Sequence, residues 1–305
     1  MIISTFQKLC LFLLSFCSLR VAHGLAIFLS ILIFSTRSKK YRVAYMNLKI
    51  CFPDKTEYWI KKTAKESLKE YMKSLLESPH LYKMSKKNIN TLIKKIHNEN
   101  IIKECLDQNK GVIFMTPHHG SWELSGLFVA SKIKIFNMFK PLRNKVLNDF
   151  VCKGRMSKGA TLVETDNTGV KQLLKALKNN HGIGILPDHT PKINQGVMSN
   201  FFDVPANTSS LIYKLGKKNK VPIIYIFSER LPNSAGFNLH LGSIKEMFYG
   251  KNVYTIHLWR DLVTKKYKLD TNGKYDPSTL WERQKRFVDN GSKFPVDMNV
   301  PKEHV

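Results

Sequence analysis

The stretch "GVIFMTPHHGSWELSG", residues 111–126, joins an apolar run, a turn and the start of a helix. The run "GVIFM" is typical of a strand that is buried on both faces of a sheet. Pro117 and Gly120 then favour a turn, and "ELSGLFVAS" at 123–131 indicates a helix. A buried strand that leads directly into a helix is characteristic of α/β folds.

Apolar strands and amphipathic helices alternate along much of the chain. Further strands are predicted at 132–136, 160–165, 182–186, 221–227 and, as a short edge, 237–242. Further helices are predicted at 57–98, 170–179, 209–218 and, in the tail beyond Gly250, around "YTIHLWRDLV". We therefore predict an α/β fold with a mostly parallel central sheet that is covered by helices on both faces.

The chain is strongly basic. Its 305 residues contain 49 Lys and Arg against 23 Asp and Glu, a net charge of +26, while 43% hydrophobic residues exclude a disordered chain. Such a charge predicts an anionic partner, which could be a nucleic acid, a membrane surface, an acidic carrier or a lipid. The five cysteines include no C-x-x-C pair, which argues against a disulfide scaffold or a structural zinc site and favours a reducing compartment.

An apolar run at 9–34 is long enough to span a hydrocarbon core of about 30 Å. Arg20 and His23 interrupt it, so a helix lying in the membrane interface or two short segments remain alternatives. A signal peptide is the other alternative, but no small-residue cleavage site precedes Arg37. We interpret residues 1–40 as an uncleaved membrane anchor.

Positive charges follow this run more than they precede it. Only Lys8 precedes it, whereas several basic residues follow closely: Arg37, Lys39, Lys40 and Arg42. By the positive-inside tendency, the rest of the chain is predicted to stay in the cytoplasm. We expect residues 41–305 to form one catalytic domain there.

The turn after residue 115 is the strongest candidate for chemistry. In an open α/β sheet, sites form beyond the carboxyl ends of the strands, where residues 117–121 are expected. Glu123 falls in the first turn of the following helix, where a carboxylate is electrostatically favoured. It could approach a histidine just before the turn, fix its tautomer and stabilise the imidazolium.

The local sequence leaves other interpretations of the histidine pair open. His119 and Glu123 are four residues apart and would share a helical face suited to a metal, but no third ligand lies nearby. Pro117 and Gly120 also argue against a helix across the pair. A histidine that merely hydrogen-bonds at a strand end is an equally good interpretation of these residues alone.

Five segments together resemble a known family. In chain order they are "NLKICFP" (47–53), "HHGSWELSG" (118–126), "FKPLRNKVLNDFVCKGR" (139–155), "GIGILPDHTP" (182–191) and "GVMSNFFDVPANTSS" (196–210). With His118 and Glu123 as H-x4-E, they resemble the lipid A late acyltransferases, the lauroyl/myristoyl branch of the H-x4-D/E acyltransferases. Ser121, His189 and Asp203 depart from the usual Asn, Gln and Gly, and the ending "YDPSTLWERQKRF" (275–287) departs more.

The resemblance implies a glycerolipid acyltransferase-like fold and transfer of an acyl chain from an acyl carrier protein thioester to a hydroxyl group. It implies that His118 is the general base and Glu123 its orienter. Arg155 is the candidate for stabilising the thioester oxygen, and Asp188 is an acid that similar enzymes keep. Trp122, Lys140 and Arg143 are candidate substrate-binding residues. No metal ion or organic cofactor is indicated.

The net charge agrees with the partners that the resemblance implies. Acyl carrier protein is acidic, lipid A precursors carry phosphates, and the inner membrane is anionic. The lysines of the helix predicted at 57–98 would suit the membrane or the carrier. We therefore expect an inner-membrane enzyme of lipopolysaccharide biosynthesis that acylates a lipid A precursor.

Two alternatives concern the acceptor and the class of protein. The same chemistry could serve another acceptor, such as a glycolipid, an ornithine-type lipid or a lysophospholipid. A non-catalytic basic binding protein would explain the charge but not the ordered motifs. The sequence lacks the aromatic-interleaved basic repeats of nucleic-acid modules, so no nucleic-acid partner is expected.

Overall fold

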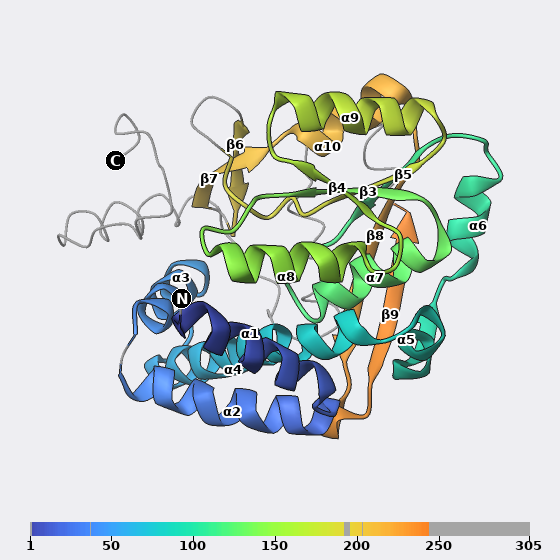
Figure 1. Ribbon diagram of the computed structural model, residues 1–305. Coiled ribbons are helices and arrows are strands. Elements are labelled where there is room, and N and C mark those ends of the chain that lie inside the picture. Colours follow the sequence, from blue (N-terminus) through green and yellow to red (C-terminus); the bar gives the residue numbers. More distant parts are fainter. Residues whose placement is uncertain (1, 37, 192–195, 203, 244–305) are drawn as a thin grey trace.

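The computed structural model describes residues 2–36, 38–191, 196–202 and 204–243 (Figure 1). Within that part, a sheet of seven strands is covered by helices on both faces, and most neighbouring strands are parallel. The predicted α/β class is confirmed. The predicted helix near "YTIHLWRDLV" and the ending at 275–287 lie outside the described residues.

The central strands are parallel and adjacent. The sheet order is β1-β9-β8-β2-β5-β3-β4, with only β8 and β9 paired antiparallel. The carboxyl ends of β2, β5 and β8 therefore meet at one edge of the sheet. The bounds are β1 Ile93–His97, β2 Val112–Met115, β3 Ile135–Phe139, β4 Thr161–Glu164, β5 Gly182–Ile185, β8 Ile223–Arg230 and β9 Phe237–Ser243.

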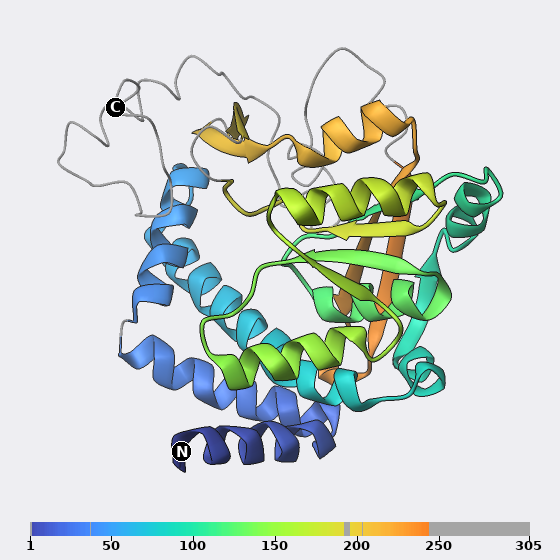
Figure 2. The ribbon, with the colours of Figure 1, turned by 45° about the horizontal axis from the view of Figure 1, so that its top comes forward.

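Alternate side chains of β2 enter opposite layers of the core. Val112 and Phe114 pack in the cluster that includes α6 and α7, whereas Ile113 and Met115 pack in the cluster of α9 and α10. Figure 2 shows α7 on one side of the sheet and α9 and α10 on the other. This period of two explains why the strand is apolar throughout. The helices are α6 Asn100–Leu106, α7 Trp122–Lys132, α9 Asn167–Lys178 and α10 Leu211–Asn219.

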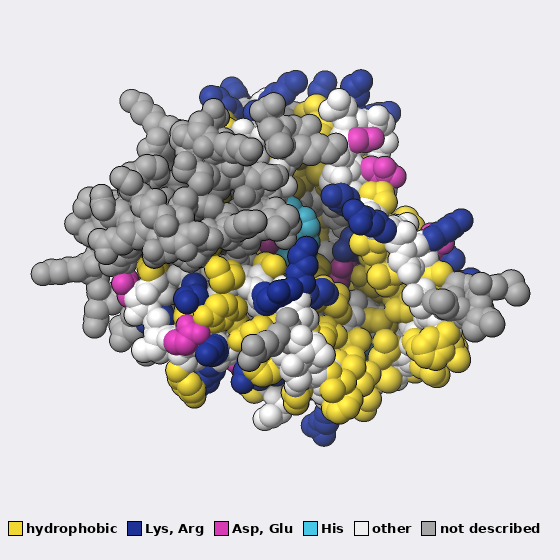
Figure 3. Space-filling view, turned by 90° about the vertical axis from the view of Figure 1, so that its left-hand side faces the viewer, with side chains coloured by type: hydrophobic (Ala, Val, Ile, Leu, Met, Phe, Trp, Pro, Cys, Tyr) yellow, Lys and Arg dark blue, Asp and Glu magenta, His cyan; other side chains and the backbone are white. Residues whose placement is uncertain are grey.

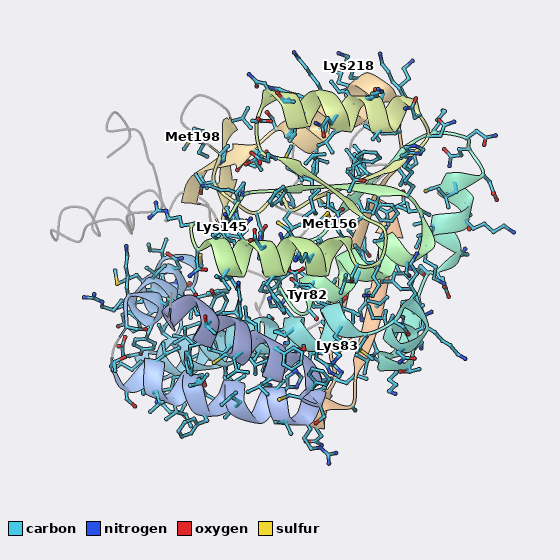
Figure 4. The ribbon with its side chains drawn as sticks, in the orientation of Figure 1. Tyr82, Lys83, Lys145, Met156, Met198 and Lys218 are labelled. Atoms are coloured by element: carbon cyan, nitrogen blue, oxygen red, sulfur yellow. The ribbon has the colours of Figure 1, made fainter. Side chains whose placement is uncertain are left out.

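A further layer of helices packs on the outer side of α7. Leu81 of α4 and Ile89 of α5 share a buried cluster with Leu124 and Leu127 of α7. Tyr82, in the last turn of α4, points toward α8 and packs against the ring of Phe150 (Figure 4). The bounds are α4 Glu57–Lys83, α5 Lys86–Leu92 and α8 Lys145–Met156.

The expected single anchor helix is two helices in the structure. The chain breaks between α1 (Ile2–Phe16) and α2 (Leu19–Ser35), where the Ser18 side chain caps α2 by accepting from the Val21 N–H. Both helices run along α4. None of the described helices is by itself long and apolar enough to cross a membrane. Only α2 with α3 (Lys39–Cys51) would be, and that pair is bent by 82°.

Two differences from the predicted elements arise from tertiary packing. Residues 93–97 were predicted helical but form β1, because Ile93 and Ile96 pack into the core beside β9. β1 is therefore the edge strand beside β9, and β9, predicted as a short edge strand, lies inside the sheet. The hairpin of β6 (Gly196–Phe201) and β7 (Val204–Ser209), like α8, was not predicted from the sequence.

We predict that Gly154→Ala destabilises the protein. A Cβ at this position of α8 would lie 2.2 Å from the Tyr82 ring, so the interface between α4 and α8 would have to open. The expected cost is about 1–3 kcal/mol, measured as a lower unfolding midpoint in denaturant.

The matched control is Gly126→Ala in α7, because a Cβ there meets no atom within 4 Å. That change should be neutral or stabilise by up to about 1 kcal/mol through helix propensity. Equal effects of the two substitutions would contradict the described contact between α4 and α8.

Candidate active site

His118 is held by Asp188 across two neighbouring strands. The His118 Nδ1 lies 2.9 Å from Asp188 Oδ1, and the backbone N–H of His118 donates to Asp188 Oδ2 at 2.7 Å. His118 follows β2 and Asp188 follows β5, and these strands pair directly. The loop is thus fixed in backbone and ring by one carboxylate, and each of the two side chains is 33% exposed.

The hydrogen bonds also keep Asp188 ionised. Burial acts to raise the pKa of the Asp188 carboxyl, but the hydrogen bond and charge of His118 outweigh it, so the pKa lies below its usual value. An ionised carboxylate beside Nδ1 favours the tautomer that carries its proton there. Nε2 is then the nitrogen with a lone pair for a substrate proton.

The expected contact between Glu123 and His118 is replaced in the structure by another ion pair. Glu123 begins α7 as predicted, but its carboxylate accepts from Arg155 Nε at 3.0 Å and from Nη2 at 2.6 Å. The cause is packing: Arg155 lies in the last turn of α8, which packs against α7. The carboxylate that orients the imidazole is that of Asp188.

The pair of Glu123 and Arg155 is charged and mostly buried. Burial acts to lower the pKa of the Arg155 guanidinium, but Glu123 outweighs it and the pKa lies above its usual value. Burial, followed by the charge of Glu123, raises the pKa of the nearby Tyr82 phenol. The Arg155 side chain keeps 29% of its surface exposed, so this fixed cation remains accessible.

Two further rings enclose His118. The ring of His189 stacks on it at a centroid distance of 4.2 Å and an angle of 20°. Trp122 approaches it edge-on at 5.5 Å. Burial, followed by the charge of His118, lowers the pKa of His189, and Lys140 adds to this effect. His189 is therefore favoured in its neutral form.

His119 faces a different part of the fold. Its ring stacks on Phe227 of β8 at 5.5 Å, and burial followed by the charge of Arg230 lowers its pKa. Among the described residues, no group of three or more His, Cys, Asp or Glu side chains is arranged to hold a metal ion. The structure thus separates the two histidines and gives His118 alone an acidic partner at the strand end.

The turn between the histidines and α7 requires glycine. Gly120 has φ of 62°, and a Cβ there would lie 2.2 Å from the Ser228 carbonyl oxygen. The same carbonyl accepts from the Ser121 N–H at 3.0 Å. Close backbone approach to β8 therefore sets the path of the loop that carries His118.

Basic side chains lie at the same edge of the sheet. Lys140 and Arg143 are exposed in the connection between β3 and α8, and β3 neighbours β5. Figure 3 shows Lys and Arg side chains beside a histidine in a hollow of the face that it draws. Lys140 is near enough to His189 to affect its pKa, so this cation is close to the stacked histidines.

The sequence profile described as "Bacterial lipid A biosynthesis acyltransferase" matches residues 4–269. The chain belongs to this family. The match includes every candidate site residue described above and most of the chain. The resemblance on which the sequence interpretation rested is thereby confirmed.

Individual relatives of this lipid A acyltransferase family member are distant. A lipid A biosynthesis acyltransferase of Haemophilus influenzae is 22% identical over 67% of this chain and 65% of its own length. The lipid A biosynthesis lauroyltransferase of Escherichia coli is 20% identical over 66% and 65%. A second Haemophilus influenzae acyltransferase is 25% identical over 71% and 68%. The chain thus spans about two thirds of the length of these relatives.

Several residues around this family member's site are not predicted from the sequence. His189 departs from the family pattern, and its position next to Asp188 is the signal that places it in the site. Tyr82 and the polar side chains beneath residue 120 had no local signal, because they come from elements far away in the sequence.

We predict that Asp188→Asn lowers kcat for acyl transfer by about 10²- to 10⁴-fold. The amide cannot stabilise an imidazolium and favours the wrong tautomer of His118, while the backbone hydrogen bond can persist. The measurement is steady-state kinetics of the folded variant with its unfolding midpoint determined in parallel.

Asp149→Asn is the matched control, because Asp149 is an exposed carboxylate of α8 outside the site. It should leave kcat unchanged. Near-normal turnover of Asp188→Asn would contradict the assignment of Asp188 as orienter.

Proposed function

We propose that the protein transfers a fatty acyl chain from an acyl carrier protein thioester to a hydroxyl group of a lipid A precursor. The observation that carries the proposal is the pairing of His118 with Asp188 at the carboxyl edge of the sheet. Family membership supports the reaction class. The names of the relatives, a lauroyltransferase among them, support lipid A biosynthesis.

In the first step, His118 acts as the general base. A hydroxyl is a poor nucleophile until its proton is removed, whereas a thioester is already activated. Nε2 of His118 takes the hydroxyl proton as the oxygen forms a bond to the thioester carbon. The positive charge that develops on the ring is balanced by Asp188, whose carboxylate accepts from Nδ1 at 2.9 Å.

In the second step, the tetrahedral intermediate collapses. The carbon–sulfur bond breaks, the carbonyl re-forms, and the imidazolium of His118 returns its proton to the leaving thiolate. The products are the ester and the free carrier thiol, so no cofactor or redox partner is needed. The transferred proton passes from alcohol to thiol through one ring nitrogen.

Arg155 is the proposed stabiliser of the anionic carbonyl oxygen. Glu123 holds the Nε and Nη2 atoms of the guanidinium, so the direction of this cation is fixed before substrate binds. In this proposal Glu123 supports catalysis through Arg155, and it does not touch the imidazole. Trp122 packs against the His118 ring, and in this proposal its side chain contacts the acyl chain beside the base.

The proposed substrates match the basic surroundings of the site. Lys140 and Arg143 are exposed at the sheet edge and suit the phosphates of a glycolipid acceptor. Acyl carrier protein is acidic and would be attracted by the positive net charge. Both substrates therefore carry the charge that this surface favours.

The N-terminal helices supply a proposed membrane-binding surface. The lower part of the face in Figure 3, where α1 and α2 lie, carries many hydrophobic side chains. So large an exposed apolar surface is typical of a membrane or protein contact, and two such helices can lie in the bilayer interface. The exposed residues are Phe6, Leu9, Phe12, Leu13, Phe16, Val21, Leu25, Ile27, Phe28, Ile31 and Leu32.

We predict that the purified protein acylates a lipid A precursor when given acyl carrier thioesters of graded chain length. Mass spectrometry should detect acylated precursor and release of the free carrier thiol. His118→Ala should reduce the rate to background because no base remains. His119→Ala, at the ring stacked on Phe227, is the neighbouring control and should keep most of the activity.

Acceptor alternatives are tested in the same assay. Parallel reactions contain a lysophospholipid, an ornithine-type lipid or another glycolipid in place of the precursor. Transfer to one of these and not to the lipid A precursor would replace the proposed acceptor and keep the chemistry. Absence of transfer to all of them by folded protein would refute the proposed function.

We predict that Phe12→Ser with Phe28→Ser weakens binding to vesicles of phosphatidylethanolamine and phosphatidylglycerol. Both side chains are more than half exposed, at 57% and 59%, so their loss removes apolar contact with lipid without opening the core. Flotation should show at least about tenfold weaker binding for the loss of two large apolar side chains. Equal binding of this variant and the wild-type protein would exclude the proposed surface.

A further inference from the structure

A buried network of charges lies beneath the loop that carries His118. Arg230, the last residue of β8, donates from Nε and Nη2 to the two carboxylate oxygens of Glu77 at 2.9 and 2.7 Å. Its Nη1 donates to Glu70 at 2.6 Å. The Arg230 side chain is 6% exposed and that of Glu77 1%, so this is an ion pair within the protein interior.

The network touches the loop directly. Arg230 Nη2 reaches the Gly120 carbonyl oxygen at 3.3 Å and Ser74 Oγ at 2.9 Å. The Ser74 hydroxyl lies 2.8 Å from the same carbonyl, to which it donates. Gly120 is thus held from below two residues after His118, while Asp188 holds His118 from the side of β5.

The same network includes the N-terminal part of the chain. His23 of α2 is 4% exposed, and its Nε2 lies 2.7 Å from Glu77 Oε2. Its Nδ1 lies 2.9 Å from the Ser234 hydroxyl, which follows β8. A continuous path of hydrogen bonds therefore runs from α2 through Glu77 and Arg230 to the backbone of the loop.

Charge balance shows how strongly the members of the network depend on one another. Burial acts to raise the pKa of the Glu77 carboxyl, but hydrogen bonding with His23 and the charge of Arg230 outweigh it, and the pKa lies below its usual value. Breaking a buried pair of this kind leaves an uncompensated charge in the protein interior, which is strongly unfavourable. The partners therefore hold one arrangement.

We propose that Arg230 is a positioning residue for His118, and that His23 connects α2 to the same hydrogen-bond network. The inference rests on the proposed acyl transfer and names residues that control its base without touching substrate. Arg230 fixes the position of the Gly120 carbonyl group. Through the backbone of the loop, it thereby fixes the position of the His118 imidazole relative to the bound substrates. In this proposal α2 helps to position the base of the active site, in addition to its proposed role in membrane binding.

The geometry of arginine is essential to this role. A guanidinium offers donors in a planar fork, so it can bind Glu77 with two atoms while it also reaches Glu70 and the loop. A lysine keeps the charge but cannot make these contacts together. Arg230→Lys therefore tests positioning while the interior stays electrically balanced.

The experiment compares two network variants with two matched controls. Arg230→Lys is paired with Glu229→Gln, the preceding residue of β8, which contacts His240 instead. His23→Leu is paired with Ser30→Ala, which is also buried on α2 but bonds within its own helix. Each protein is purified at full length, and its unfolding midpoint, kcat and KM for the acyl carrier thioester are measured.

We expect both network variants to lower kcat by about 10- to 100-fold while the KM for the thioester changes less than about twofold. The loss in the double variant should be clearly smaller than the product of the two single losses, because both substitutions act through one path. The controls should match the wild-type protein. Unchanged kcat in Arg230→Lys and His23→Leu would overturn the proposal, as would losses of activity that follow only the loss of folded protein.

A second measurement does not depend on acyl transfer. Hydrogen exchange of the peptide containing Ser121, whose N–H donates to the Ser228 carbonyl, should accelerate in the network variants and stay unchanged in the controls. If the wild-type protein transfers no acyl group, the proposed function fails, and local exchange still decides the positioning role. Exchange that rises evenly over the whole chain, or not at all, would refute that role.

Discussion

The direct pairing of β2 with β5 is the constraint on which the candidate site depends. Parallel pairing places the residues after both strands at one edge, so His118 and Asp188 meet although 70 residues separate them. The bond from the His118 backbone to the same carboxylate ties the loop to the neighbouring strand. A change in strand order would leave each residue in place along the chain and separate the two groups.

The class of fold could be predicted from the sequence because its signals are local. The apolar run at 111–115 and the glycine turn after it carry the strand-to-helix pattern in a short window. The order of strands is not local. Nothing within residues 111–126 shows which other strand lies beside them. The local sequence therefore predicts Glu123 as the partner of His118, whereas the structure has Asp188 there.

Tertiary pairing also explains why some elements differ from the predicted ones. Residues 93–97 contain lysines and two isoleucines, which fit a helix as well as a strand. Pairing with β9, a tertiary contact, makes them extended. The candidates His118, Glu123, Arg155 and Asp188 were found as residue types in family motifs, whereas their arrangement in two pairs required the structure.

The hydrogen-bonded pair of His118 and Asp188 and the ion pair of Glu123 and Arg155 have different surroundings, and the proposed mechanism gives each pair a different role. His118 and Asp188 are partly exposed, which suits the proton exchange with substrate that the proposed mechanism requires. Glu123 and Arg155 are more deeply buried, as suits charges that keep one position. In the proposed mechanism, the proton that moves and the cation that stays fixed belong to separate pairs, so a change in one pair need not disturb the other.

The inward face of α2 has a consequence for which substitutions the helix tolerates. Ala22 and Ala26 are fully buried there beside His23, whereas the outward positions carry large apolar side chains. An outward leucine can be replaced by another apolar residue with little effect on packing. An added methylene on either alanine would push the helix outward and lengthen the contact between His23 and Glu77. Natural variants of this helix should therefore differ freely at the outward positions and hardly at all at the buried inward positions.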